Sequence, residues 1–177
     1  PLCRCLRVDG MSAPTDAPVA LVAGVGRGTG GAVARRYAAA GYRVALLARS
    51  ESRVKEFEAE LEGSLAIPCD VTDEAAVEAA VAMCSTELGV PDVVIHNAAR
   101  GTHGTFLDID PSDMEANFQV NTMSLLYLAR AVAPAMIERG SGAVMVTGNT
   151  SALRGKAGFA AFAPTKAAQR ILAEAIA

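Results

Sequence analysis

The stretch Val19-Ala-Leu-Val-Ala23, followed without interruption by Gly24-Val-Gly-Arg-Gly-Thr-Gly-Gly31, decides the fold of this chain. A continuous apolar run is typical of a strand that is covered on both faces in a parallel sheet. Glycine permits positive φ and lets a phosphate approach the backbone closely. The helix that we expect at 31–40 offers free N–H groups and a partial positive charge at its N-terminus. This order predicts a dinucleotide-phosphate site, and the alternative is a tight turn without a ligand.

The rest of the chain repeats the alternation of strand and helix. Further strands are expected at 43–48, 65–69, 92–96 and 143–147, and further helices at 51–60, 73–88, 111–139 and 163–177. Ser50, Thr72 and Asp110 are the expected caps of the second, third and fourth helices, and Pro134 is expected to bend the fourth. Short connections predict a parallel sheet with right-handed crossovers. The expected fold is therefore a Rossmann-type, doubly wound α/β/α domain with five strands in the order 3-2-1-4-5.

The chain is interpreted as a leader followed by one domain. Residues 1–17 are expected to be a disordered leader, and residues 18–177 an NAD(P)-binding domain. Residues 1–10 lack the apolar core of a signal peptide, which favours a cytoplasmic protein. They are attributed to translation upstream of a start at Met11 or to a cloning remnant. Doubly wound domains normally have six or more strands, so the domain is expected to be incomplete at its C-terminus.

The composition is that of a globular protein, with 51% apolar residues, 20% charged residues and a net charge of −3. No Lys/Arg cluster suggests nucleic acid or a membrane surface. No uninterrupted apolar run reaches the roughly 18 residues that span a bilayer. The cysteines Cys3, Cys5, Cys69 and Cys84 are expected to be free thiols in a reducing cytosol. Because Cys3 and Cys5 lack a second pair of ligands, no metal site is expected.

Four later segments repeat the signatures of one family. They are Cys69-Asp-Val71, His96-Asn-Ala-Ala99, Asn121 and Phe162-Ala-Pro-Thr-Lys166. Together with the spacing Gly24-x-x-x-Gly28-x-Gly30, and in this order, they resemble the short-chain dehydrogenase/reductase family over residues 19–177. A second spacing, Gly26-x-Gly28-x-x-Gly31, fits the general dinucleotide fingerprint, but an extended-type epimerase fits the chain less well.

The resemblance implies most of a cofactor site. Asp70 is expected to lie against an adenine, and Lys166 to hydrogen-bond the nicotinamide ribose. Ala99 stands where the family has a glycine. The expected cofactor-binding residues are Gly24, Gly26, Arg27, Gly28, Thr29, Gly30, Arg49, Ser50, Asp70, Val71, Asn97, Ala98, Ala99 and Lys166.

Two arginines distinguish between the two nicotinamide dinucleotides. An Asp or Glu at the end of the second strand binds the ribose hydroxyls of NAD, but here that strand ends in Ala48-Arg49-Ser50. Arg27 and Arg49 can meet a 2′-phosphate with paired hydrogen bonds, and Ser50 can add a hydroxyl donor. We therefore expect NADP(H) rather than NAD(H), and the alternative is that both arginines are solvated surface residues.

The expected catalytic positions depart from the resembled family. There a tyrosine is the acid/base, a lysine four residues later lowers its pKa, a serine holds the carbonyl oxygen and an asparagine supports a water-linked proton path. Lys166 and Asn121 match the lysine and the asparagine of the family. Phe162, however, occupies the position of the tyrosine, and Asn149 occupies that of the serine. A phenylalanine ring cannot donate a proton to a substrate oxygen.

No other side chain clearly replaces the missing phenol. Thr150 and Ser151 are the hydroxyls nearest to the serine position. His103 and Thr105 follow the fourth strand near the cofactor side of the sheet, and His103 is interpreted as a surface loop residue. His96 is interpreted as structural.

Three functions remain open. The first is an NADP(H)-dependent oxidoreductase that acts on the carbonyl/alcohol pair of a small-molecule substrate. The second is a non-catalytic NADP(H)-binding protein, which Phe162 favours, and the third is an inactive fragment. The resemblance also implies a four-helix contact between copies through the last two long helices, hence a homo-oligomer, either a dimer or a tetramer. Apolar residues on more than one face of the long helix favour that contact, and the alternative is their burial within one chain; they are Leu125, Leu126, Leu128, Ala129 and Val132.

Overall fold

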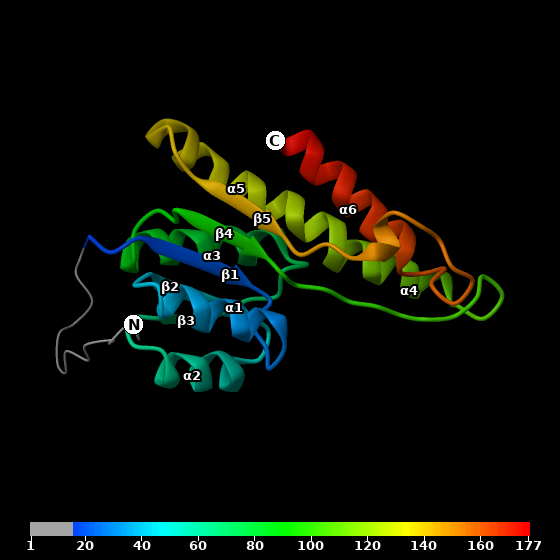
Figure 1. Cartoon of the computed structure of the whole chain (residues 1–177), viewed down its shortest axis with the longest axis horizontal. Helices are drawn as coiled ribbons and strands as arrows, with labels where there is room; N and C mark the ends of the chain where they lie inside the picture. Colours follow the sequence, from blue (N-terminus) through cyan, green and yellow to red (C-terminus); the bar gives the residue numbers. More distant parts are fainter. Residues whose placement is uncertain (1–15) are drawn as a thin grey trace, which may run out of the picture.

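Five parallel strands form the centre of the molecule (Figure 1). They are β1 (Val19–Ala23), β2 (Arg43–Ala48), β3 (Leu65–Pro68), β4 (Val93–His96) and β5 (Ala143–Val146), and their spatial order is β3-β2-β1-β4-β5. The Rossmann-type fold and the strand order expected from the sequence are confirmed. The computed structural model describes residues 16–177. The expectations for the leader up to residue 15, for a start at Met11, and for Cys3 and Cys5 lie outside the described residues.

Helices cover both faces of the sheet. They are α1 (Thr29–Ala38), α2 (Glu51–Glu60), α3 (Glu74–Glu87), α4 (Pro111–Phe118), α5 (Ser124–Arg139) and α6 (Ala163–Ile176), with a short 3-10 turn η2 (Thr150–Ala152) before α6. Side chains of α1 and α2 pack with Val22 and Leu46 on one face, and side chains of α3 and α5 pack with Leu21 and Leu47 on the other. Neighbouring residues of β1 therefore enter different cores, because side chains alternate along a strand.

The caps of two helices are as expected, and one is displaced by a residue. Ser50 caps α2 and Asp110 caps α4 through their side chains. The cap of α3 is Asp73 rather than Thr72. The Thr72 hydroxyl instead donates a hydrogen bond of 2.8 Å to the Asp70 carboxylate. An aspartate at the start of a helix satisfies free N–H groups and also meets the positive end of the helix dipole.

The helical stretch 111–139 changes its hydrogen bonding at a different place from the one expected. A π-helical segment, η1 (Gln119–Met123), joins α4 to α5, whereas Pro134 lies inside α5 without ending it. Proline removes one helical hydrogen bond, that of the carbonyl four residues earlier. This carbonyl belongs to Arg130, and both residues are exposed, so water can satisfy it. A π-helical segment often marks a functional position.

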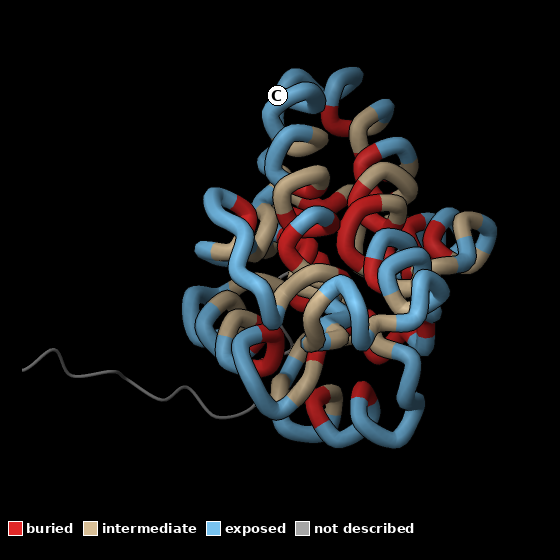
Figure 2. Tube along the Cα trace, turned by 90° about the vertical axis from the view of Figure 1, so that its right-hand side faces the viewer, coloured by how far each residue is buried: buried red, intermediate tan, exposed pale blue. Residues whose placement is uncertain are grey.

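By length and composition alone, the stretch 111–139 could cross a membrane. Its apolar character is explained by packing, because Leu125, Leu128, Ala129 and Val132 are buried against the rest of the chain. Figure 2 shows buried segments of this kind gathered between the layers. These four residues are therefore buried within one chain and do not form an apolar outer face. The exposed apolar side chains of the last two long helices are Ile137, Ile171 and Ile176.

Strand β5 forms one edge of the sheet, and its side chains on the α1 side are uncovered. Met145 is 52% exposed, and its only side-chain hydrogen bond within residues 16–177 is a 3.3 Å contact from the Tyr37 hydroxyl to its sulfur. The neighbouring Ile95 of β4 is buried on this same face. The sheet is thus covered on both faces at its centre and on one face at this edge.

Candidate functional site

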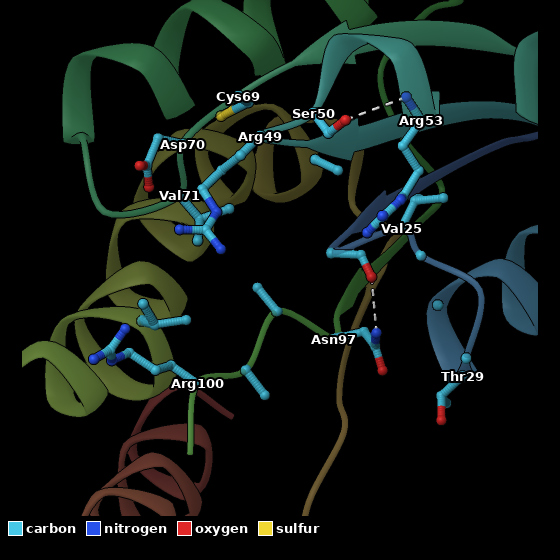
Figure 3. A pocket seen from close by; sticks show the side chains of 18 residues that line it. Val25, Thr29, Arg49, Ser50, Arg53, Cys69, Asp70, Val71, Asn97 and Arg100 are labelled. Atoms are coloured by element: carbon cyan, nitrogen blue, oxygen red, sulfur yellow. Dashed lines mark hydrogen bonds between the residues drawn. The ribbon is translucent and has the colours of Figure 1, made fainter. Parts of the chain in front are cut away.

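A pocket of about 680 Å³ opens at the carboxyl ends of the strands (Figure 3). Chain segments that follow β1, β2, β3 and β4 all contribute to it. The sheet order reverses between β1 and β4, and ligands of doubly wound sheets bind in the crevice at that point. The lining residues are Gly24, Val25, Gly26, Gly28, Thr29, Gly30, Ala48, Arg49, Ser50, Arg53, Cys69, Asp70, Val71, Asn97, Ala98, Ala99, Arg100 and Val120.

The glycine-rich turn forms one wall of this pocket, and its glycines have two different roles. Gly24 has a φ of +96°, and a Cβ there would lie 2.4 Å from the backbone nitrogen of Ala98. A Cβ on Gly30 would lie 2.1 Å from the carbonyl oxygen of Gly24. Both glycines are therefore required by packing. A Cβ on Gly26 or Gly28 would meet nothing within 4 Å, so at these positions the backbone is left open toward the pocket. The turn thus fits a phosphate group that approaches the main chain.

Hydrogen bonds tie this turn to the strands that follow it. The Asn97 side-chain amide donates to the Gly24 carbonyl at 2.9 Å, and the Thr147 hydroxyl donates to the Asn97 carbonyl oxygen at 3.0 Å. The Lys166 ammonium in turn donates to the Thr147 carbonyl at 2.9 Å. The Asn97 side chain thus fixes the turn, and Asn97 also lines the pocket. Lys166 lies behind the end of β5 and is not among the residues that line the pocket.

The end of β2 brings together a different pair of arginines from the one expected. Arg49 and Ser50 line the pocket as expected, but Arg27 does not, and Arg53 does. In Figure 3, Arg49 extends toward Val71 and Arg53 toward Val25, so the two guanidinium groups flank the end of β2. Arg53 lies in the first turn of α2, and its backbone N–H donates to the Ser50 hydroxyl at 3.4 Å. Its place in the first turn of the helix that Ser50 caps was the signal in the sequence that could have identified it.

Asp70 supplies a carboxylate at the opposite wall. It accepts hydrogen bonds from the backbone N–H of Thr72 at 3.0 Å and from its hydroxyl at 2.8 Å. These bonds, with a smaller contribution from the positive charge of Arg49, hold the pKa of Asp70 below its usual value. The group is therefore an ionised hydrogen-bond acceptor near neutral pH. The preceding thiol of Cys69 is buried, and burial raises its pKa to about 11, so it stays protonated.

Other lining residues were not among the expected cofactor-binding residues. Val25 lies in the glycine turn, Ala48 ends β2 and Cys69 follows β3, whereas Arg100 and Val120 approach from the loop after β4 and from η1. Val25 and Cys69 lie inside motifs of the sequence, but no signal distinguishes Ala48, Arg100 or Val120 from ordinary core or surface positions.

The residues expected at the reaction centre lie beyond one end of the pocket. Phe162 is the N-terminal cap of α6 and is partly buried. Lys166 lies one turn later, with 3% of its surface exposed, and burial lowers the pKa of its ammonium. Its backbone N–H donates to the Phe162 carbonyl at 3.2 Å. The helical spacing expected between these two positions is thus present, with a hydrocarbon ring at the first.

Asn121 is held by the chain itself. Its side-chain oxygen accepts from the Arg100 N–H at 3.0 Å, and its amide donates to the Arg100 carbonyl at 2.9 Å and to the Thr165 hydroxyl at 2.8 Å. The residue lies within the π-helical segment η1. Its side chain therefore joins η1, the loop after β4 and α6, next to Lys166.

The position of the expected serine has a structural role. The Asn149 side chain accepts from the Ser151 N–H at 2.9 Å and caps η2. The Ser151 hydroxyl is buried and has no hydrogen-bond partner within residues 16–177. Ser151 thus offers a buried hydroxyl near this position that is not committed to another described group.

The two histidines lie in opposite environments. His96 is fully buried, with its Nε2 2.6 Å from the Ser124 hydroxyl and its Nδ1 3.0 Å from the Gln169 amide. Burial, with a smaller contribution from the charge of Lys166, lowers the pKa of His96 to about 4. His103 is exposed, and its ring contacts the ring of Phe159.

Metal-binding side chains do not cluster in the described part of the chain. Over residues 16–177, no group of three or more His, Cys, Asp or Glu side chains is arranged to hold an ion. Cys69 and Cys84 are buried free thiols.

Comparisons with known proteins match nearly the whole described chain. A family model for the short chain dehydrogenases matches residues 18–177. A 2,3-dihydro-2,3-dihydroxybenzoate dehydrogenase of Bacillus subtilis is 30% identical over 157 residues, which make up 86% of this chain and 60% of that protein. An NADP-dependent 3-hydroxy acid dehydrogenase of Escherichia coli is 31% identical over 156 residues, which make up 84% of this chain and 61% of that protein.

A solved structure gives the same match in three dimensions. The gluconate 5-dehydrogenase of Burkholderia cenocepacia, in complex with NADP and tartrate, superimposes with a TM-score of 0.83 and 29% identity. The match covers 91% of this chain and 65% of that one. This chain therefore spans less than two thirds of the length of each of these three proteins.

Proposed function

Because this chain belongs to the short-chain dehydrogenase family, we propose that it is the nucleotide-binding part of an oxidoreductase that uses NADP(H) and acts on a carbonyl/alcohol pair. The observation that carries the proposal is the pocket at the strand ends, in which an open glycine turn, the Asp70 carboxylate and two guanidinium groups surround one space. These three features match the pyrophosphate, the adenine and the 2′-phosphate of one ligand.

Each part of that ligand has a suitable partner on this chain. The main chain at Gly26 and Gly28 leaves room for a pyrophosphate, and the N-terminus of α1 adds free N–H groups. The ionised Asp70 accepts a hydrogen bond from an adenine amino group. Arg49 and Arg53 suit a 2′-phosphate, because a guanidinium meets phosphate oxygens with paired hydrogen bonds. Two relatives that bind or depend on NADP support the same choice.

The chemistry is divided between the ligand and the chain. When bound, a nicotinamide ring supplies or accepts the hydride, and the protein must orient it and move a proton. Lys166 keeps a buried cation one turn from position 162, and the Asn121 side chain fixes the adjoining segments. These residues can position a substrate oxygen, but Phe162 can exchange no proton with it.

Fluorescence titration with NADPH and NADH tests this function. Each hydrogen bond between the 2′-phosphate and a charged side chain adds about 1.5–3 kcal/mol to the binding free energy. We therefore expect NADPH to bind at least about 10-fold more tightly than NADH. Arg49→Asp should reverse the preference, because it removes a phosphate partner and adds an acceptor for ribose hydroxyls. Equal affinities for the two nucleotides in the unmodified chain would contradict the proposal.

A second candidate is a non-catalytic NADP(H)-binding protein, and Phe162 is the observation that favours it. Such a protein would bind NADPH as above and would oxidise it with no ketone, aldehyde or quinone. An assay of NADPH oxidation against a panel of these compounds separates the two candidates.

We also propose that the protein assembles as a homo-oligomer through α5 and α6. Ile137, Ile171 and Ile176 are 78%, 52% and 38% exposed on these helices, and exposed apolar side chains grouped on neighbouring helices favour a protein interface. Light scattering at micromolar concentration should give a mass at least twice that of one chain, and a stable monomer would refute the proposal.

A further inference from the structure

His103 lies beside the position where the proton donor is missing. Its ring centroid is 4.9 Å from that of Phe159, with the two ring planes at 81°, and 6.0 Å from that of Phe162. Gly101, two residues earlier, also touches this ring, since a Cβ there would be 3.3 Å from Phe162. The loop after β4 therefore runs directly along the ring at position 162.

The loop that carries His103 is anchored at both ends. At its start, the backbone N–H and carbonyl of Arg100 are both bonded to the Asn121 side chain, at 3.0 and 2.9 Å. At its end, the Gly104 N–H donates to the Gly158 carbonyl at 2.9 Å, and the Ala160 N–H donates to the Gly104 carbonyl at 3.2 Å. These bonds join the loop to the segment that leads into Phe162. They fix the backbone on both sides of His103, and the ring itself is placed by its contact with Phe159.

The imidazole of His103 is available for proton exchange, in contrast to that of His96. No hydrogen bond within residues 16–177 engages either ring nitrogen of His103, and the residue is exposed. Both nitrogens of His96 are close to hydrogen-bond partners in the core. An imidazole is the side chain that most readily gains and loses a proton near neutral pH, and solvent can return the proton that His103 gives up.

Three charged groups on the loop of His103 and on α6 already have partners. Arg100 of the same loop forms a 3.0 Å ion pair with Asp113 of α4. The Asp108 carboxylate accepts a hydrogen bond from the Thr105 hydroxyl, and Lys166 of α6 donates to a backbone carbonyl. Lys156, on the segment before α6, is exposed. Among the groups that bear titratable protons here, the imidazole has the closest contact with the aromatic rings at 159 and 162.

We propose that His103 is a catalytic residue, the proton donor that replaces the absent phenol during carbonyl reduction; this inference rests on the proposed oxidoreductase function. A bound NADPH would supply the hydride by breaking its own C–H bond, which leaves NADP⁺. The hydride forms the new C–H bond at the carbonyl carbon, and the π electron pair of the C=O bond moves onto oxygen. The imidazolium N–H of His103 breaks as its proton passes to that oxygen, which gives the alcohol and a neutral imidazole. A proton from water then restores the imidazolium. In alcohol oxidation, the neutral imidazole accepts the same proton.

The test compares His103→Phe with the unmodified full chain. Phenylalanine keeps the aromatic contact with Phe159 but has no proton to give. We expect kcat for NADPH oxidation with a responsive ketone or aldehyde to fall about 10²-fold or more, the usual contribution of a positioned acid, while the Kd for NADPH stays within about 2-fold. Leu107→Ala, at a 79% exposed position of the same loop, is the matched control and should change neither value.

Two further readouts distinguish catalysis from packing. Added imidazole should restore part of the turnover of His103→Ala, which a purely structural role would not allow. Phe162→Tyr should restore turnover in the His103→Phe background, because it returns a donor to the neighbouring position.

The outcomes separate this inference from the function on which it rests. If NADPH does not bind, the proposed function itself fails. If NADPH binds but His103→Phe keeps full turnover, His103 is not the donor. The inference is also overturned if the unmodified chain binds NADPH without any turnover and becomes active with Phe162→Tyr alone.

Discussion

The two ends of the candidate site are built in different ways. The phosphate-binding end is one continuous segment, Gly24–Gly30, whose shape depends on backbone positions that leave no room for a side chain. The proton-transfer end is assembled from separate segments: His103 after β4, Asn121 in η1, and Phe162 and Lys166 at the start of α6. Side-chain hydrogen bonds to backbone groups hold these segments together, such as that from Asn117 to the Ala161 carbonyl at 3.0 Å.

This difference explains how position 162 can lack its phenol while the fold remains intact. Asn117, Asn121 and Thr122 join η1 and α4 to the start of α6, and none of these bonds uses the side chain of residue 162. A side chain that does not hold the scaffold can change without moving it. In the glycine turn, by contrast, positions that packing requires and positions that are open to a ligand alternate within one short segment.

The comparison predicts the largest effect for a methyl group in the turn. Gly30→Ala places a Cβ 2.1 Å from the Gly24 carbonyl oxygen, so the turn must move. We expect the free energy of unfolding to fall by about 1–3 kcal/mol, as for other overpacked sites, with loss of NADPH binding. Gly26→Ala is the matched control, because its Cβ meets nothing within 4 Å. Urea denaturation should show the control within about 0.5 kcal/mol of the parent, and equal losses in both variants would refute this account.

At the proton-transfer end, one added hydroxyl should act on turnover and leave binding unchanged. Phe162→Tyr places a phenol one turn before Lys166, whose charge favours the ionised form. In the His103→Phe background we expect kcat to rise roughly 10²-fold, with a larger rise when Asn149→Ser is added. Phe159→Tyr adds the same hydroxyl to a neighbouring ring and is the control. Steady-state NADPH oxidation measures this rise, and an unchanged kcat would show that the missing phenol does not limit turnover in that background.

The buried His96 should make stability depend on pH. Its pKa is lowered to about 4 in the folded chain, against about 6.5 in an unfolded one. Between these values the unfolded chain binds the extra proton, so the free energy of unfolding falls as pH decreases through this window. From pH 7 to pH 5 the loss should be about 2 kcal/mol.

Urea denaturation at several pH values measures this loss, and His96→Asn is the control. The variant should be less stable but nearly insensitive to pH above about 4.5, because carboxyl groups with a lowered pKa, such as Asp70 and Glu58, affect stability only at lower pH. An unchanged pH dependence in the variant would assign the effect to other groups.

The smallest effect distinguishes two arginines of the phosphate-binding end. Arg53→Ala should weaken NADPH binding about 10-fold and NADH binding little, since it removes one charged donor to the 2′-phosphate. Arg27→Ala should leave both affinities within about 2-fold, because Arg27 does not line the pocket. Fluorescence titration of both variants tests this. A larger loss of NADPH affinity in Arg27→Ala would instead support Arg27 and Arg49 as the pair that binds the 2′-phosphate.

The sequence by itself determined the order of strands and helices, the parallel sheet and the glycine turn. These features depend on local patterns: apolar runs, capping residues such as Ser50 and Asp110, and glycines next to a strand. It also placed Lys166 one turn after Phe162, because helical spacing is a local property.

Only the tertiary structure decided which side chains meet across the chain. It placed Arg53 beside Arg49 in the lining of the pocket, where Arg27 is absent, and it placed a π-helical segment at η1. It also brought His103 against Phe162, two positions that are far apart in the sequence. The physical reason is that such contacts depend on how loops cross the ends of the sheet and on hydrogen bonds between distant segments, which residue periodicity does not encode.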